Sequence, residues 1–385
     1  MRGSLAAKGA LLSCAAVVVL MCVPGCEVGG GGNTATVPDS LGKRLDEILE
    51  SSQKNFKAPA LTAALIQDGT VIWSESLGSR WAGGPGEVGD ETPFIAASTA
   101  KTVTAAIALR LVDEGKLKLE DPLSRYIDGL PGAGRILISD LLRHTSGLPD
   151  YLYSPSIDRV MRTEPDHPWT RDEVLAPVDW LDSEPGRSFE YSNTNYVALG
   201  GVIEQAGGGQ IQPLFEELVA DTLGLEVSDW RYGGLPKEAL ARPYLETPWS
   251  RADGLHRAVW PGREVPTDFW GEVWTDGGLA TTAGELGLIA NEMIAGDLLQ
   301  PETRRRVLRI GMGASGLGLF AQRAAGKRWF GHDGLYDGFA SQHWTDPASG
   351  VTIAVMTSLE TFSDPDVSAE TWSRLARAVT RSGLS

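Results

Sequence analysis

The chain has 385 residues, of which 42% are hydrophobic and 22% are charged. This composition is that of an ordinary globular protein, so it excludes a collagen, a coiled coil and an intrinsically disordered chain. The formal net charge of −16 argues against a nucleic-acid-binding protein and against a basic face that binds anionic lipid.

The cysteines and histidines restrict the chemistry that the chain can carry out. All three cysteines, Cys14, Cys22 and Cys26, lie at the start, so the rest of the chain has no disulfide framework, thiolate metal site or cysteine nucleophile. The five histidines are scattered and show no metal-ligand spacing. We therefore expect neither a metal nor a cofactor.

The first residues are predicted to be a targeting signal rather than part of the folded domain. A positively charged start precedes an apolar run over 10–23, which is too short to span a bilayer and has signal-peptide proportions. Small residues before Cys26 resemble the bacterial lipobox, which predicts a lipoprotein signal over 1–25 and lipidation of Cys26. The alternative is a plain secretory signal with an incidental cysteine. Residues 26–37 contain four consecutive glycines and are predicted to be a tether to the extracytoplasmic face of a bacterial membrane.

The body begins with helical and extended patterns in alternation. An amphipathic helix is predicted to start at 38–40, because leucine and isoleucine recur on one face. Apolar runs over 61–66 and 70–76 are joined by an Asp-Gly pair, which predicts a hairpin with a type I′ turn. Residues 98–114 form the most apolar helical stretch of the chain.

The second half of the chain alternates helices with loops and ends in strands. Residues 150–187 are rich in Pro and Asp and are expected to be irregular, whereas 225–276 form loops with five tryptophans. Those tryptophans could line a substrate cleft, but packing of the loops themselves is the favoured interpretation. The remaining predicted helices lie at 141–144, 196–205, 213–223, 282–293 and 364–380, and the predicted strands at 317–322, 339–345 and 351–357.

This order of elements predicts an α/β fold of the α+β type. Strands occur at both ends of the body and helices in its middle, which indicates one antiparallel sheet built from about 38–96 and 280–385. Helices at the two ends would flank the sheet, and about 97–279 would form an all-helical insertion. We expect residues 38–385 to be one domain.

A Ser-x-x-Lys pattern occurs three times, beginning at Ser40, Ser51 and Ser98. The first two lie in the polar N-terminal helix and are interpreted as surface residues. Ser98 opens the apolar helix, at the positive end of its dipole, and Lys101 follows one turn later on the same face. A desolvated lysine with a lowered pKa could remove the serine proton. From this pattern alone, a charged lysine at a helix end is an equally good interpretation.

Two further motifs occur once each and follow in a fixed order. Tyr191 begins the only Tyr-x-Asn and His332 begins the only His-x-Gly. With these three motifs in order, the sequence resembles the penicillin-recognising serine hydrolases, which comprise class C β-lactamases, D,D-carboxypeptidases and related serine esterases. The stretches that are also similar to this family lie at 144–149, 191–196, 277–282 and 316–319.

The resemblance implies a catalytic role for three residues. Ser98 would be acylated, and Lys101 would share proton transfer with Tyr191, whose phenolate a neighbouring ammonium would stabilise. Class A β-lactamases are a poorer match because they carry Ser-Asp-Asn where this chain has Tyr-Ser-Asn. A Gly-x-Ser-x-Gly motif is absent, which argues against an α/β-hydrolase.

The resemblance also implies a substrate-binding role for four residues. Asn193 would hydrogen-bond the lysine and the substrate amide, while His332 and Gly334 would belong to the third motif. The backbone N–H groups of Ser98 and Leu335 would form the oxyanion hole.

Two departures from the family bear on the substrate. His332 stands where β-lactamases usually have lysine, and Phe320 stands where related D,D-carboxypeptidases place an arginine for the substrate carboxylate. Arg323 is the nearest replacement. We therefore expect a cell-surface serine hydrolase acting on an ester or amide, which would be a small molecule or a cell-wall peptide. The alternatives are a β-lactamase and a catalytically silent penicillin-binding or wall-interaction lipoprotein.

Overall fold

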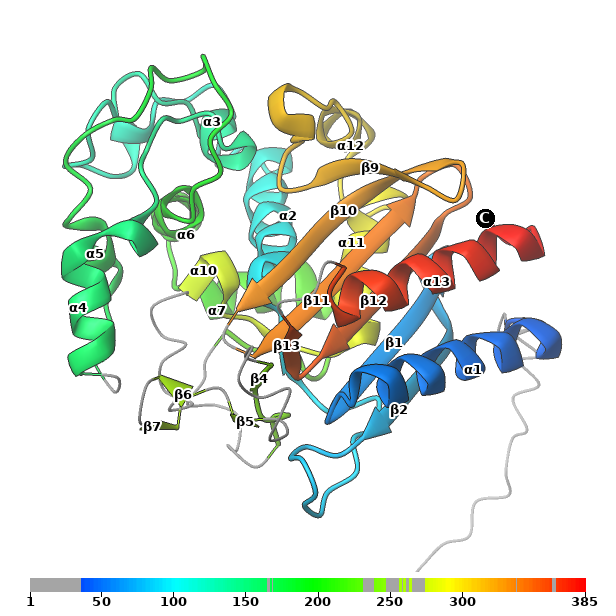
Figure 1. The fold of residues 1–385 in the computed structure, drawn as a ribbon. Coiled ribbons are helices and arrows are strands. Elements are labelled where there is room, and N and C mark those ends of the chain that lie inside the picture. The colour runs from blue at the N-terminus through cyan, green and yellow to red at the C-terminus, as the bar shows by residue number, and fades with distance from the viewer. Residues whose placement is uncertain are drawn as a thin grey trace, which may run out of the picture. The chain divides into compact units, whose positions relative to one another are not determined.

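A six-stranded antiparallel sheet, in the order β2-β1-β12-β11-β10-β9, forms the centre of the fold (Figure 1). Strand β1, from the start of the body, pairs with β12, from its end, so that Leu61 lies opposite Thr357. The antiparallel sheet predicted from both ends of the sequence is therefore confirmed. Its strands are β1 Ala60–Gln67, β2 Thr70–Gly78, β9 Phe320–Ala324, β10 Lys327–Tyr336, β11 Phe339–Asp346 and β12 Val351–Thr357.

This computed structural model describes part of the chain in atomic detail. Cys26 and the predicted signal peptide lie outside the described residues, as does nearly all of the predicted tether. In the part that is described, no helix is both long and apolar enough to cross a membrane. The described residues are 36–164, 167, 169–230, 239–246, 256–257, 259–260, 263–264, 274–336, 338–361 and 365–385.

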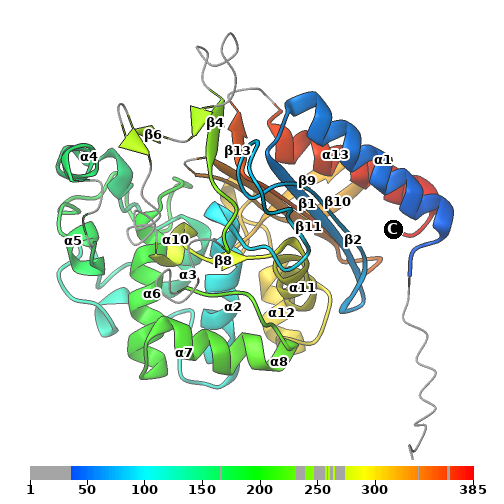
Figure 2. The same ribbon diagram turned by 90° about the horizontal axis from the view of Figure 1, so that it is seen from below.

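Two helices cover one face of the sheet, as Figures 1 and 2 show. They are α1, Asp39–Phe56, and α13, Val367–Ser382. The apolar stripe of each helix points at the sheet, where Leu49 of α1 and Leu375 of α13 are buried in one cluster with Trp329 of β10. Apolar spacing in the sequence thus produces two helices that can be stable only when they pack on the sheet.

The opposite face of the sheet carries the main core and most of the helices. Helix α2, Ala100–Asp113, is buried over most of its surface, as its mostly apolar sequence leads one to expect. Helix α11, Ala283–Ile294, packs on β1 and β12 beside it. The other helices are α3 Ile138–Arg143, α4 Pro155–Thr163, α5 Arg171–Leu175, α6 Thr194–Gly207, α7 Ile211–Phe215, α8 Asp221–Leu223, α10 Trp274–Gly277 and α12 Pro301–Val307.

The insertion is not helical throughout, which corrects the prediction of an all-helical segment. Strand β4, Tyr244–Glu246, lies within the predicted insertion. It pairs in parallel with β13, Leu359–Thr361, which follows the last strand of the main sheet. Residues 150–187 are also more regular than expected, since α4 and α5 form there. The remaining short strands are β3 Phe94–Ile95, which pairs with β8 Ala280–Thr281, then β5 His256–Arg257, and β6 Val259–Trp260, which pairs with β7 Arg263–Glu264.

Two local predictions have different outcomes. The hairpin between β1 and β2 is confirmed, and Asp68 and Gly69 have φ angles of 48° and 73°, as a type I′ turn requires. In contrast, no strand was predicted between 322 and 339, whereas His332 lies inside β10. Two glycines and an aspartate interrupt the apolar alternation of that strand, so the pattern did not reveal it.

Candidate active site

Ser98 lies in a tight 3-10 turn, Ala97–Thr99, immediately before α2. The turn begins with a left-handed backbone conformation, because Ala97 has a φ angle of 51°. Thr99 Oγ1 donates to the carbonyl oxygen of Ala96 at 2.6 Å and lies 3.0 Å from the hydroxyl of Ser341 on β11. These bonds fix the turn on the sheet and leave the side chain of Ser98 partly exposed.

Two of the predicted catalytic side chains meet the hydroxyl of Ser98. Lys101 Nζ lies 3.1 Å from Ser98 Oγ, and Tyr191 Oη donates to the same oxygen at 2.9 Å. Lys101 also donates to the backbone carbonyl of Asp276 in α10. Two distant parts of the sequence thus meet at one oxygen atom, and a third part supplies the carbonyl that holds Lys101.

The electrostatics of this cluster favour uncharged side chains. Burial lowers the pKa of Lys101, although the carboxylates of Asp276 and Asp150 oppose that change. Burial raises the pKa of Tyr191, and its hydrogen bond with Ser98 acts in the opposite direction. Burial therefore makes more of the uncharged amine of Lys101 available beside Ser98 than a lysine in water would offer at the same pH.

Among the described hydrogen bonds, none joins Asn193 to Lys101, although the resemblance implied one. Its backbone N–H and its Nδ2 both donate to Asp150 Oδ2, at 3.2 and 2.8 Å. Asp150 is held in turn at the start of a 3-10 turn, where it accepts the backbone N–H of Leu152. The side-chain amide of Asn193 is therefore oriented by the buried carboxylate of Asp150. Lys101 instead donates a hydrogen bond to the carbonyl oxygen of Asp276.

His144 supports the ring of Tyr191 from beneath. The two rings are stacked with their centroids 4.3 Å apart, and His144 Nδ1 accepts the backbone N–H of Ser192 at 3.2 Å. Burial lowers the pKa of His144 far below its ordinary value, so the imidazole is neutral and can accept this bond. His144 thus fixes both the ring and the backbone of the Tyr-x-Asn motif.

Strand β10 forms the opposite wall of the site. A Cβ atom on Gly334 would lie 2.8 Å from the backbone nitrogen of Ser98, so glycine permits this close approach. The next residue, Leu335, is 45% exposed. His332 is buried, which lowers its pKa to about 3, and the charge of Lys101 acts in the same direction. Its Nε2 atom has no hydrogen-bond partner among the described residues.

A cavity of about 400 Å³ opens in front of Ser98. Phe320 forms part of its wall and lies against His332, with ring centroids 5.0 Å apart. Arg323 is opposite Arg328 in the β9–β10 register, about 10 Å along the strand from Phe320. The described lining includes no arginine or lysine, and consists of Ser98, Tyr191, Phe320, His332, Asp333, Gly334 and Leu335.

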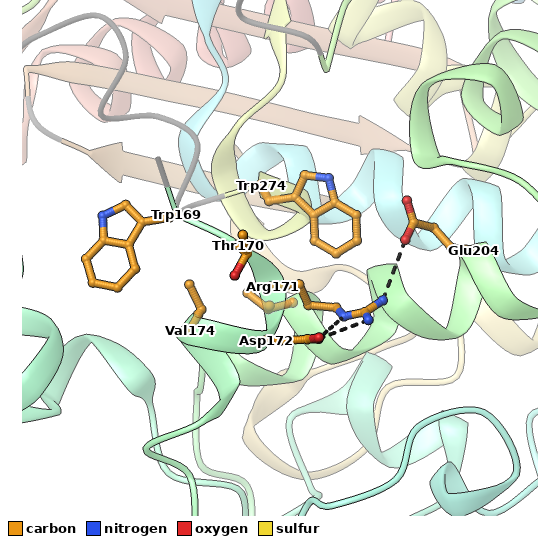
Figure 3. Close-up of a pocket in the computed structure, with 8 residues that line it drawn as sticks. Trp169, Thr170, Arg171, Asp172, Val174, Glu204 and Trp274 are labelled. Carbon is orange, nitrogen blue, oxygen red and sulfur yellow. Dashed lines mark hydrogen bonds and ion pairs between the residues drawn. The ribbon is translucent and has the colours of Figure 1, made fainter. Parts of the chain in front are cut away.

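A second pocket of about 320 Å³ lies between α5, α6 and α10 and contains none of the three motifs (Figure 3). Trp274 of α10 lines it, and Arg171 forms ion pairs there with Asp172 and Glu204. Of the other tryptophans in 225–276, Trp230 is buried against Phe215, which is the packing role that the sequence analysis favoured. Trp249 and Trp270 lie outside the described residues, as does the side chain of Trp260.

Three polar residues of the site were not singled out from the sequence. They are His144, Asp150 and Asp276, and the two acids directly adjoin stretches that resemble the family. Burial raises the pKa of Asp276 to about 7, while the charge of Lys101 lowers it. In the described part of the chain, no group of His, Cys, Asp and Glu side chains could hold a metal ion.

Comparison with known proteins supports the fold and the family. Esterase EstB of Burkholderia gladioli is 29% identical over 225 residues, which cover 53% of this chain and 55% of the esterase. The D-aminopeptidase of Brucella ovis is 23% identical over 334 residues, or 82% of this chain and 59% of that enzyme. The chain thus spans little more than half the length of either relative.

A solved D-amino acid amidase from Ochrobactrum anthropi has the same fold, with a TM-score of 0.76 and 22% identity over 89% of this chain and 99% of that one. The penicillin-binding protein homologue from Pyrococcus abyssi gives a TM-score of 0.73 at 21% identity, over 89% of this chain and 77% of that one. The family model for beta-lactamase matches residues 45–378. The resemblance seen in the three motifs is therefore confirmed, and the chain belongs to the beta-lactamase family of serine hydrolases.

Proposed function

We propose that the protein hydrolyses an ester or an amide through an acyl-enzyme on Ser98. The observation that carries this proposal is the convergence on Ser98 Oγ, where Lys101 Nζ lies at 3.1 Å and Tyr191 Oη at 2.9 Å. A serine hydroxyl needs such a neighbouring base to become a nucleophile. Two proteins that match this chain are named as an esterase and a D-aminopeptidase. Their names support an ester and an amide as the bonds that the protein hydrolyses.

In the acylation step, Ser98 Oγ attacks the carbonyl carbon and its proton passes to the uncharged amine of Lys101. The carbonyl oxygen becomes an oxyanion beside the backbone N–H groups of Ser98 and Leu335, where one donor contributes roughly 3–4 kcal/mol. Tyr191 donates its proton to the leaving alcohol or amine, and the proton held by Lys101 replaces it. The bond to the leaving group breaks, and the acyl group remains on Ser98.

In the second step, water attacks the acyl carbon and gives a proton to the pair formed by Lys101 and Tyr191. The bond between the acyl carbon and Ser98 Oγ then breaks as that oxygen regains a proton. A carboxylic acid leaves, and the site returns to its starting state without any other reactant.

The cavity favours substrates that have no carboxylate next to the reacting bond. Its described lining carries Asp333 and no cationic side chain. Asp150 and Asp276 lie close enough to Lys101 to influence its pKa. A substrate carboxylate would meet this acidic surrounding without a charge-assisted hydrogen bond in return. This argues for a neutral ester or amide over a penicillin or a peptide ending in D-Ala-D-Ala.

Labelling with a fluorophosphonate, followed by mass spectrometry, tests the proposal. We expect the probe on Ser98, no labelling in Ser98→Ala, and wild-type labelling in Ser40→Ala and Ser51→Ala, which alter the same motif elsewhere. Labelling of another serine would contradict the assignment. Labelling of Ser98 without turnover of any ester, amide or β-lactam would support the silent binding protein instead.

We also propose that the protein is held at the extracytoplasmic face of the membrane by lipidation of Cys26. The support is the lipobox-like end of the predicted signal and the glycine-rich tether that follows it. Replacement Cys26→Ala is expected to move the protein from the membrane fraction to the soluble fraction. Unchanged fractionation of that variant would overturn the anchor and leave the catalytic proposal intact.

A further inference from the structure

Helices α1 and α13 lie side by side on the face of the sheet opposite α2 (Figure 2). A groove of about 310 Å³ lies between them. Its charged residues are all arginines, and no acidic residue lines it. We refer to it as the arginine groove. The residues that line it are Arg44 and Ile48 of α1 with Arg374, Arg377, Ala378 and Arg381 of α13.

The three arginines of α13 share one stripe of the helix. Arg374, Arg377 and Arg381 are three and four residues apart, which places them on the same side of a helix. Arg374 is held in place, because its guanidinium donates to Ser52 Oγ at 3.0 Å and to Ser51 Oγ at 2.6 Å. The groove therefore combines one fixed guanidinium with others that are exposed to solvent.

The fourth arginine has only a weak competing partner. Arg44 forms an ion pair with Glu47 at 2.9 Å, and both side chains are more than 60% exposed, at 63% and 65%. Exposed pairs of this kind contribute little, so an anion with several oxygens can compete for this guanidinium. Planar guanidinium groups bind phosphate oxygens through two parallel hydrogen bonds.

The groove contrasts with the charge of the whole chain. The formal net charge of −16 by itself argues against a basic face that binds anionic lipid. Helix α13, however, has three arginines and one glutamate, and its arginines face α1 across the groove. Four like charges that line one groove repel one another unless an anion lies among them. An average over the sequence therefore does not report this local cluster of positive charge.

We propose that the arginine groove binds the phosphate groups of anionic phospholipids and holds α1 and α13 against the membrane. The choice of a lipid rests on the proposed anchor, because the predicted tether leads from Cys26 directly into α1. Glycine-rich linkers of about twelve residues span roughly 20 Å on average, so the proposed anchor would keep the start of α1 and Arg44 close to the bilayer surface. The active site, on the other face of the sheet, then stays open to solvent.

Binding to vesicles tests this proposal without the anchor. The full chain carrying Cys26→Ala is mixed with vesicles of phosphatidylcholine alone or with added phosphatidylglycerol, and the bound fraction is measured by sedimentation. We expect binding only to the anionic vesicles, with an affinity that falls as salt is added. The combined variant Arg44→Gln, Arg377→Gln and Arg381→Gln should bind at least tenfold more weakly, since each arginine near such a surface contributes about fivefold.

A matched variant controls for the change in net charge. Arg125→Gln, Arg135→Gln and Arg305→Gln remove three exposed arginines outside α1 and α13, and this variant should bind within about twofold of the parent. Equal weakening by both variants, or no binding of the parent to anionic vesicles at low salt, would overturn the proposal. Binding to a soluble glycerol phosphate polymer without binding to vesicles would also overturn it. Ester hydrolysis should be the same in all three proteins, so a failure of the catalytic proposal is recognised separately.

Discussion

Lys101 is buried beside Ser98. This position bears on whether Lys101 or Tyr191 accepts the first proton in the proposed reaction. Burial disfavours the ammonium form and so lowers the pKa of the lysine. The same burial disfavours a phenolate at Tyr191 and raises the pKa of that side chain. Burial thus acts on both side chains in the direction that their proposed roles require.

The first prediction concerns Tyr191. Replacement Tyr191→Phe keeps the ring that stacks on His144 but removes the hydroxyl that reaches Ser98, so kcat/KM should fall by roughly 10²–10⁴. The wild-type kcat/KM should rise with pH, because the unprotonated amine is the base, and should level off below the ordinary lysine pKa of 10.5. Steady-state kinetics with a p-nitrophenyl ester between pH 5 and 10 measures both effects. A variant within threefold of the wild type would show that another group transfers the proton.

The second prediction concerns specificity and Phe320. Replacement Phe320→Arg places a cation in the cavity wall and should raise kcat/KM for carboxylate-bearing substrates by about 10–150-fold, the effect of one charge-assisted hydrogen bond. Neutral esters should be nearly unaffected. The comparison uses one neutral ester, one D-Ala-D-Ala peptide and one cephalosporin, with Phe320→Met as the uncharged control. A wild type that already prefers the peptide or the β-lactam tenfold would reveal a carboxylate receptor elsewhere.

At the scale of elements, β10 and the turn at Ser98 must approach each other closely. Strand β9 pairs with β10 only as far as Gly331, so residues 332–336 of β10 have no partner on β9. A Cβ atom on Gly334 would meet the carbonyl oxygen of Ala96 at 2.9 Å as well as the nitrogen of Ser98 at 2.8 Å. A side chain there would push apart the two segments that supply the proposed oxyanion hole.

The third prediction follows from this contact. Replacement Gly334→Ala should lower kcat/KM by about 10²–10³, the cost of losing one oxyanion donor. Gly284→Ala is the matched control, because the nearest atoms to a new Cβ lie at 3.8 and 3.9 Å. Far-UV circular dichroism should show that both variants are folded. Wild-type activity in a folded Gly334→Ala protein would argue against the strand's role in catalysis.

The elements were predictable where local chemistry decides the structure. The Asp-Gly turn of the first hairpin and the apolar stripe of α1 are local signals, and both elements form as expected. Strand β10 was missed because its Gly-His-Asp-Gly stretch has low strand propensity and pairs only through the rest of the sheet. The motifs located Ser98 and Tyr191, whereas the contacts of Asp150 and Asp276 depend on segments far apart in the sequence, which no local pattern reports.

At the scale of the whole molecule, buried histidines make the stability depend on pH. His343 of β11 is fully buried, and its Nε2 lies 3.0 Å from the hydroxyl of Thr102 in α2. Burial lowers its pKa from 6.5 to about 3. Between these values the unfolded chain binds a proton that the folded chain does not, so acid favours unfolding.

The fourth prediction uses this linkage. As the pH falls below 6.5, the wild type should lose about 1.4 kcal/mol per pH unit from His343, and His343→Gln should not. Urea unfolding of both proteins at pH 7.5, 5.5 and 4.5 measures the difference in unfolding free energy. As the pH falls, the unfolding free energy of the wild type should decrease more than that of the variant. A gap that stays constant over this range would mean that His343 has the same pKa in the folded and the unfolded chain.

The pairing of β1 with β12 has a consequence for how the chain acquires its structure. Leu61 meets Thr357, so one of the inner contacts of the sheet joins segments almost three hundred residues apart, which the register of the two strands makes explicit. Contacts of such high sequence separation slow folding, because a long loop must close before they form. During synthesis the first hairpin would leave the ribosome long before its partner strand exists. Truncation before β12 would therefore remove the neighbour of β1 even if every motif residue were retained.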